Sequence, residues 1–239
     1  FAKANPIPVY LHFFDWFDAK TWDESTFVEP FDWAKLGTSL AERGSETFYE
    51  RQFRYIKALG VTDLAWEFNA TRDGRLTYPP ASAIQAARAV GLGFAPVYDL
   101  EITLQVYSGS PDIRPELATP GKITATPETA KMICHDLGVF FKDVPPDLVG
   151  HDAHGSVPIF VFGFDNTEFN PPAWDKFDTM LNGCMAQVAG PNFKFYWSAT
   201  NIPMEEHMFQ HDRAHIVPWQ FVSDMPQSQY SHDSVTLNF

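Results

Sequence analysis

Short runs of apolar residues recur along the chain, and each run ends on polar or charged residues. Runs of four to eight apolar residues with polar boundaries are typical of buried strands. Six such runs lie at positions 9–14, 63–68, 94–98, 158–164, 193–197 and 216–221. The pattern therefore predicts six strands, each with a polar cluster at its carboxyl end.

Segments with helical periodicity separate the predicted strands. Thr47 and Glu50 have the spacing of a capping box, and Gly60 is placed to end the same helix. Gly91 closes the next periodic segment, and Thr126 precedes a Pro-Glu pair that is typical of a helix start. A fourth helix is expected after the proline pair at 171–172. Strands that alternate with helices predict a parallel sheet.

Polar residues at the carboxyl ends of all the strands favour a TIM-type (β/α)8 barrel, because active sites of such barrels form at that end. We expect one barrel domain over residues 1–239. A closed barrel needs eight strands, usually in about 250 residues. The sequence supplies six, with a possible seventh at 235–237. We therefore expect the chain to stop before the last one or two βα units.

The amino-acid composition limits the classes of ligand and the cellular locations that we expect. The net charge of −13 disfavours binding to nucleic acid, and no apolar run reaches the 18 residues of a membrane span. An uncharged partner fits better, and aromatic residues, at 15%, are abundant. No signal peptide is recognisable at the start of the sequence, although the expected location is secreted or periplasmic. Cys134 and Cys184 lie on apolar faces of predicted helices, so they form either a disulfide or two buried thiols.

The acidic residues at the strand ends suggest hydrolysis of glycosidic bonds. That reaction needs two carboxyl groups, one to protonate the leaving oxygen and one to act as nucleophile or base. Neighbouring strands are about 4.8 Å apart, so carboxylates on adjacent strand ends meet the required spacing. The candidate catalytic residues are Asp99, Asp165, Glu67, Glu101 and Glu168.

Sugar rings bind where aromatic plates meet polar groups. The candidate substrate-binding residues are His12, Asp15, Trp16, Asn69, Tyr98, Trp197 and Gln220. Structural roles remain open for three of the residues above. Glu67, inside a strand, can be a brace with a partner, Glu168 can cap the following helix, and His12 can be a core histidine.

Metal and cofactor motifs are weak or missing. His207 and His211 are four residues apart, as on one helix face, but the segment lacks the internal Glu of a zinc protease helix. The sequence contains no dinucleotide fingerprint, no phosphate loop and no nucleophile elbow. We therefore predict no metal site and no cofactor.

Several segments, in order, resemble glycoside hydrolase family 99 and its WbsX-type relatives. These segments are VYLHFFDWFD, FYERQFRYIKALGVTDLAWEF, AIQAARAVGLGFAPVYDLE and VPIFVFGFDNTEF. The resemblance implies a (β/α)8 barrel that acts on α-mannosides or related glycans with retention and without a catalytic metal. The residues that match the family pattern are His12 to Trp16 after the first strand, Asp99 after the third and Asp165 after the fourth.

The chain departs from that family in one respect. The family's catalytic glutamates lie in a late segment of the form Trp-Asn-Glu-Trp-x-Glu-Gly, which does not occur before Phe239. No catalytic residue of the family is therefore carried over. The leading hypothesis is a glycoside hydrolase acting on a poly- or oligosaccharide through carboxylates. The alternatives are a non-catalytic carbohydrate-binding barrel and a metal-dependent sugar isomerase or hydrolase.

Overall fold

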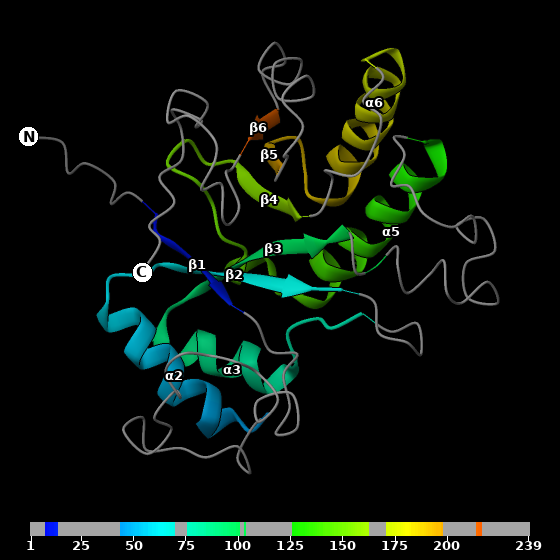
Figure 1. Ribbon diagram of the computed structural model, residues 1–239. Coiled ribbons are helices and arrows are strands. Elements are labelled where there is room, and N and C mark those ends of the chain that lie inside the picture. Colours follow the sequence, from blue (N-terminus) through cyan, green and yellow to red (C-terminus); the bar gives the residue numbers. More distant parts are fainter. Residues whose placement is uncertain are drawn as a thin grey trace, which may run out of the picture.

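The computed structural model describes residues 8–13, 44–69, 76–100, 103, 126–162, 171–197 and 214–216, which form an α/β structure. Strands and helices alternate along these residues, as the sequence predicts (Figure 1). The elements are β1 (Tyr10–Phe13), α2 (Glu46–Ala58), β2 (Asp63–Phe68), α3 (Ala81–Val90), β3 (Gly93–Asp99), α5 (Pro127–Asp143), the 3-10 turn η3 (Pro146–Leu148), β4 (Val157–Phe162), α6 (Pro171–Val188), β5 (Phe193–Trp197) and β6 (Ala214–Ile216).

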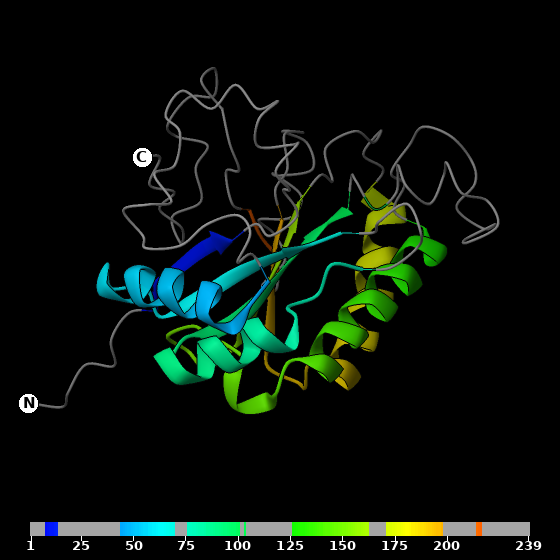
Figure 2. The same ribbon diagram turned by 90° about the horizontal axis from the view of Figure 1, so that it is seen from below.

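The strands form one parallel sheet whose spatial order follows the sequence, β1-β2-β3-β4-β5-β6. Right-handed crossovers between successive parallel neighbours place every connecting helix on the same side of the sheet. Figures 1 and 2 show this arrangement, with α2 and α3 along β1 to β3, and α5 and α6 beside β3 to β5. The opposite side of the sheet is called the inner face below.

Capping residues fix the helix ends. The side chain of Ser45 accepts a hydrogen bond from the backbone N–H of Phe48, so α2 begins earlier than the predicted capping box at Thr47. Thr126 caps α5 as predicted, because its hydroxyl accepts the backbone N–H of Thr129 at 3.2 Å. Gly91 has a φ of 78° at the end of α3, in the left-handed region that favours glycine.

Residues of each strand alternate between the helices and the inner face. Phe13 of β1 meets Phe53 of α2, Phe68 of β2 stacks on Phe140 of α5, and Trp197 of β5 contacts Trp174 of α6. Their sequence neighbours therefore point to the inner face. The inner-face residues of the five longer strands include Tyr10, His12, Ala65, Glu67, Ala95, Asp99, Phe160 and Tyr196.

The sheet curls around its inner face. The rings of Tyr10 on β1 and Phe160 on β4 are 5.8 Å apart, although three strand intervals of a flat sheet span about 14 Å. Phe160 also stacks on Tyr196 of β5 at 5.1 Å. Ala65 and Ala95, the small residues of β2 and β3 on this face, leave room for these rings. Among the described strands, β1 and β6 are the two edges, so these strands form a curved, unclosed parallel sheet.

The sixth strand differs from its prediction. The structure places β6 at Ala214–Ile216, beside β5, whereas the apolar pattern predicts residues 216–221. Residues 217–221 of the predicted strand lie outside the described residues. The predicted seventh strand at 235–237 lies outside the described residues.

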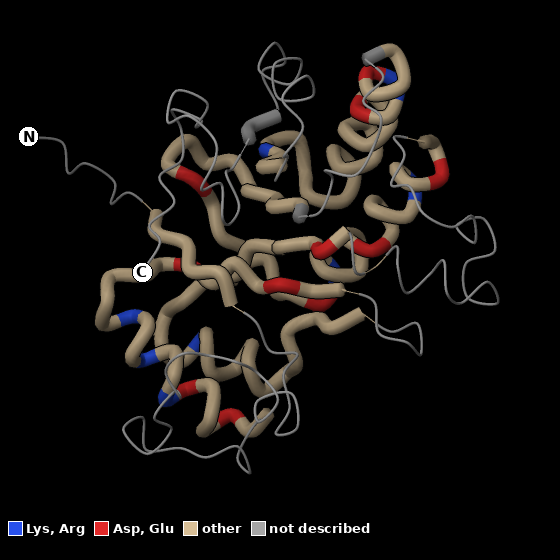
Figure 3. The backbone as a smooth tube through the Cα atoms, in the orientation of Figure 1, with Lys and Arg blue, Asp and Glu red and all other residues tan. Residues whose placement is uncertain are grey.

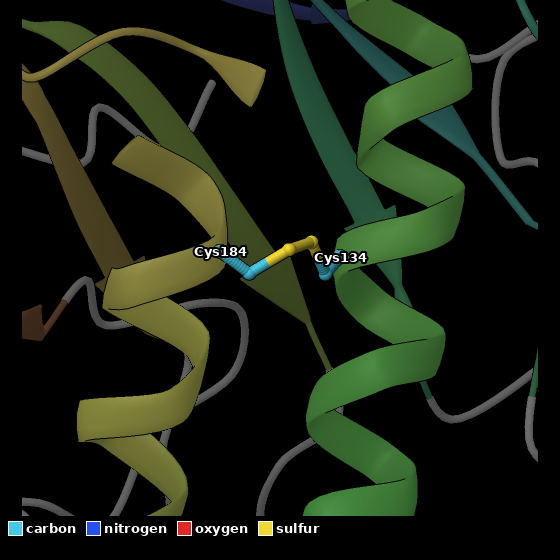
Figure 4. The surroundings of a disulfide bond; sticks show 2 residues. All are labelled: Cys134 and Cys184. Carbon is cyan, nitrogen blue, oxygen red and sulfur yellow. A yellow bond between two sulfur atoms is a disulfide. The ribbon is translucent and has the colours of Figure 1, made fainter. Parts of the chain in front are cut away.

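A disulfide joins the two helices that cover β4. Cys134 of α5 and Cys184 of α6 have Cα atoms 6.2 Å apart and are bonded (Figure 4). One helical turn further along each helix, a Cβ on Gly138 would lie 3.6 Å from a methyl group of Val188, so the backbones approach closely there. The structure thus decides between the two states that the sequence left open.

Candidate functional site

Four polar residues of the inner face gather at the carboxyl ends of three successive strands. They are His12 of β1, Glu67 and Asn69 at the end of β2, and Asp99 of β3. All four were predicted as site residues. Figure 3 shows acidic residues in red near the carboxyl ends of β2 and β3. The four residues are called the inner polar cluster below.

His12 and Glu67 are in direct contact. The Nε2 atom of His12 lies 2.6 Å from Oε2 of Glu67. The Glu67 side chain is 4% exposed and that of His12 is 19% exposed, so the imidazole is the more accessible partner. Burial lowers the pKa of His12 to about 3, because removal from water penalises the imidazolium. His12 is therefore neutral near pH 7. Glu67 has the close polar partner that a charge inside a strand requires.

Asn69 and Asp99 lie next to the last pair of the β2–β3 ladder. The last paired residues of β2 and β3 are Phe68 and Tyr98, so Asn69 and Asp99 follow one position later. Both are buried. Thr77 holds Asn69 in place, because its hydroxyl accepts the backbone N–H of Asn69 and its own backbone N–H donates to the Asn69 carbonyl. Asp99 is the last residue of its strand, so a carboxyl group ends β3 as the sequence predicts.

Two of the predicted aromatic residues do not belong to the cluster. Tyr98 faces the helices, where its hydroxyl donates to Oδ2 of Asp136 in α5 at 2.7 Å. Trp197 is fully buried, with its ring 5.2 Å from that of Trp174 in α6. The physical reason is strand alternation: once Asp99 faces inward, its neighbour Tyr98 must face the helices. Both residues are core residues and are removed from the candidate site.

The remaining predicted site residues lie outside the described residues. They are Asp15, Trp16, Glu101, Asp165, Glu168 and Gln220. The chain positions of these residues relative to described elements are still informative. Asp15 follows β1 by two residues, Glu101 follows β3 by two, and Asp165 follows β4 by three. Each of them thus remains a prediction for the same end of the sheet.

Three aromatic residues on the inner face were not predicted as site residues. The ring of Phe160 contacts those of Tyr10 and Tyr196 on the inner face, and the strand register puts Phe160 level with Glu67. We call the three aromatic residues the aromatic floor. The alternation of side chains along each strand could have indicated that these three residues share the inner face, because the neighbours of each pack against the helices. The pattern was present but did not indicate that rings from β1, β4 and β5 meet.

The described strands that carry the inner polar cluster have acidic residues but no Lys or Arg. Among the described residues, Lys and Arg lie on α2, α3, α5 and α6 and at position 194 of β5, whereas β1, β2 and β3 carry none. The inner polar cluster therefore combines carboxyl, amide and imidazole groups without a nearby cation on its own strands. Such groups bind hydroxyl-bearing neutral ligands better than anions.

The described part of the chain contains neither a cluster of metal ligands nor a helix that could span a membrane. There, no three His, Cys, Asp or Glu side chains come together in a way that holds an ion. His207 and His211 lie outside the described residues. None of the described helices has the length and apolar character needed to cross a bilayer.

Comparison with models of protein families and with curated proteins finds no match to this chain.

Proposed function

We propose that the protein is a glycoside hydrolase acting on a poly- or oligosaccharide at the carboxyl end of its parallel sheet. We further propose that the curved sheet is part of a single (β/α)8 barrel domain. The observation that carries the function is the inner polar cluster. It brings two carboxyl groups, an amide and an imidazole from three successive strands to the end where barrel active sites form.

Asp99 is the proposed catalytic carboxylate. It ends β3 on the inner face and is 2% exposed. The candidates for the second carboxyl group are Asp165 and Glu168 after the neighbouring strand β4, Glu67 of the neighbouring strand β2, and Glu101 after β3 itself. Carboxyl groups about 5 to 9.5 Å apart suffice for hydrolysis, and the strand spacing of about 4.8 Å supports that range.

An α-mannoside is the proposed substrate class. The proposal rests on the resemblance to glycoside hydrolase family 99 and on the lack of Lys and Arg along β1, β2 and β3. Asn69 and His12 are the proposed ligands for sugar hydroxyls. A neutral His12 suits this role, because the neutral imidazole offers one donor and one acceptor.

The disulfide supports an extracytoplasmic location. Disulfides persist in oxidising compartments and are rare where cellular thiols keep cysteines reduced. Cys134 and Cys184 are bonded between two helices rather than placed at a reactive surface. We therefore propose that the protein works in the periplasm or outside the cell.

Turnover of soluble α-mannan by the Asp99→Asn variant tests the function. Loss of the carboxylate should lower turnover by about 100-fold or more, with the circular dichroism spectrum unchanged. Asp143→Asn is the matched control, because Asp143 is exposed at the end of α5. A neutral β-glucan and an acidic pectin, assayed in parallel, test whether the ligand is uncharged and whether it is a mannan.

The outcomes separate the three hypotheses. Release of sugar by the wild type and its loss in Asp99→Asn support the hydrolase. Saturable glycan binding without product indicates a carbohydrate-binding barrel instead. Activity that disappears on chelation and returns with a divalent cation indicates the metal-dependent alternative. Equal turnover in the wild type and Asp99→Asn contradicts the role of Asp99.

A further inference from the structure

Asn69 is the residue of the inner polar cluster that follows its strand instead of lying in it. The ladder between β2 and β3 ends at the pair of Phe68 and Tyr98, and the ladder between β1 and β2 ends at Trp66. Asn69 thus lies where the regular pairing of β2 stops. Contacts from outside the sheet therefore contribute to its position.

The chain segment around Thr77 returns to the end of β2 and is anchored to the core. The indole N–H of Trp66, a residue that is 1% exposed, donates to the backbone oxygen of Thr77 at 3.1 Å. The ring of Tyr78 lies 5.3 Å from that of Phe68. The hydroxyl of Tyr78 donates to the backbone oxygen of Asp136 in α5 at 3.0 Å. Contacts with β2 and with α5 therefore hold this segment in place.

The side chain of Thr77 contacts both the backbone and the amide of Asn69. Its hydroxyl accepts the backbone N–H of Asn69 at 3.1 Å and lies 3.4 Å from Oδ1 of the same residue. The backbone N–H of Thr77 donates to the Asn69 carbonyl oxygen at 3.1 Å. Any residue except proline could make this last contact, whereas the contact at the Asn69 N–H needs an acceptor in the side chain. The hydroxyl of Thr77 therefore matters for Asn69.

We propose that Thr77 is a positioning residue that acts through Asn69 on the bound sugar. Its hydroxyl fixes the backbone and the amide of Asn69, so that the amide meets a sugar hydroxyl without losing further freedom on binding. This inference rests on the proposed function, in which Asn69 binds the sugar. It adds to the site a residue that the sequence did not predict and that acts without touching the ligand.

Hydrogen exchange measured by NMR tests the contact without a ligand. Asn69 is 6% exposed, and its backbone amide should exchange about tenfold or more faster in Thr77→Val than in the wild type, because valine offers no acceptor. Thr77→Ser keeps a hydroxyl and should restore slow exchange. Thr77→Ala, which also lacks the hydroxyl, serves if the valine variant does not fold. Equal exchange rates with and without the hydroxyl overturn the positioning role.

Turnover of soluble α-mannan tests the effect on the ligand. We expect Thr77→Val to raise KM about tenfold, as for one lost hydrogen bond, and to change kcat by less than about threefold. Thr77→Ser should return KM to within about threefold of the wild-type value. Thr179→Val is the matched control, because Thr179 is exposed on α6 and its hydroxyl donates to the backbone oxygen of Asp175 in the same helix.

A double variant separates positioning from general destabilisation. Asn69→Ala removes the amide and keeps the backbone N–H, so its KM measures the loss of the sugar contact alone. Adding Thr77→Val to Asn69→Ala should raise KM no further, because Thr77 acts through Asn69. A further rise of about tenfold in the double variant overturns the inference while the proposed function stands. A fall in kcat with unchanged KM in Thr77→Val does the same.

Failure of the proposed function gives a different result. A wild type that neither binds nor hydrolyses α-mannan overturns that function and the ligand half of this inference. The exchange rates of Asn69 in Thr77→Val and Thr77→Ser are measured without a sugar. They still decide whether the hydroxyl of Thr77 holds Asn69.

Discussion

Removal of the Cys134–Cys184 disulfide should lower the free energy of unfolding by a calculable amount. The two cysteines are 50 residues apart in the sequence. A cross-link of that span restricts the unfolded chain, and the loop-entropy relation gives about 4 kcal/mol at 25 °C. Because α5 and α6 still pack through their apolar faces, the helices should stay in place without the bond. We therefore expect a less stable protein with the same fold.

The assay is urea unfolding followed by tryptophan fluorescence, for which Trp174 and Trp197 are buried reporters beside α6. The unfolding midpoint should fall on reduction of the wild type and in the Cys134→Ala, Cys184→Ala double variant. Reductant should have no effect on the double variant, which makes it the control. Two titratable thiols in the unreduced wild type, or equal midpoints before and after reduction, would refute the reasoning.

Three other predictions concern the core and the inner face. Tyr98→Phe removes a hydroxyl that donates to the buried carboxylate of Asp136, so unfolding should become about 1 to 3 kcal/mol easier by urea titration. Gly93→Ala should destabilise by about 1 to 3 kcal/mol in the same assay, because the new Cβ would overlap with Oδ1 of Asp63, whose carboxylate Thr62 holds, and would lie 3.2 Å from the backbone oxygen of Leu148. The lowered pKa of His12 means that the unfolded chain binds more protons between pH 6.5 and about 3, so its contribution to stability is lost as pH falls through this window. The fall in the urea midpoint between pH 7 and 4 should therefore be smaller in His12→Gln than in the wild type.

Matched variants make these three predictions selective. Tyr55→Phe alters an exposed tyrosine, and His154→Gln alters an exposed histidine, so neither should reproduce the effect at Tyr98 or His12. Gly138→Ala should be tolerated, since its Cβ would meet Val188 at an ordinary contact distance of 3.6 Å. A midpoint for Gly93→Ala equal to that of the wild type would contradict the close approach of Asp63 to the backbone. Equal pH dependence in His12→Gln and the wild type would contradict the burial of a neutral imidazole.

The local sequence determined the elements and the positions of several site residues. Apolar runs with polar ends predicted the first five strands, because a strand buried on both faces needs continuous apolar residues. Thr126 and Gly91 marked helix ends through chemistry that acts within a few residues. Asp99 was predicted at a strand end for the same local reason, and the structure places it there.

Contacts between distant segments were decided by the tertiary structure alone. Strand alternation gives two faces but does not name the one that helices cover, so Tyr98 was predicted for the site and lies in the core. The contact of His12 with Glu67 depends on strand register across 55 residues, and the meeting of Tyr10 with Phe160 depends on sheet curvature. The pairing of Cys134 with Cys184 depends on the packing of two helices. The periodicity of a sequence cannot predict these contacts, because each depends on how the sheet curves and how its layers pack.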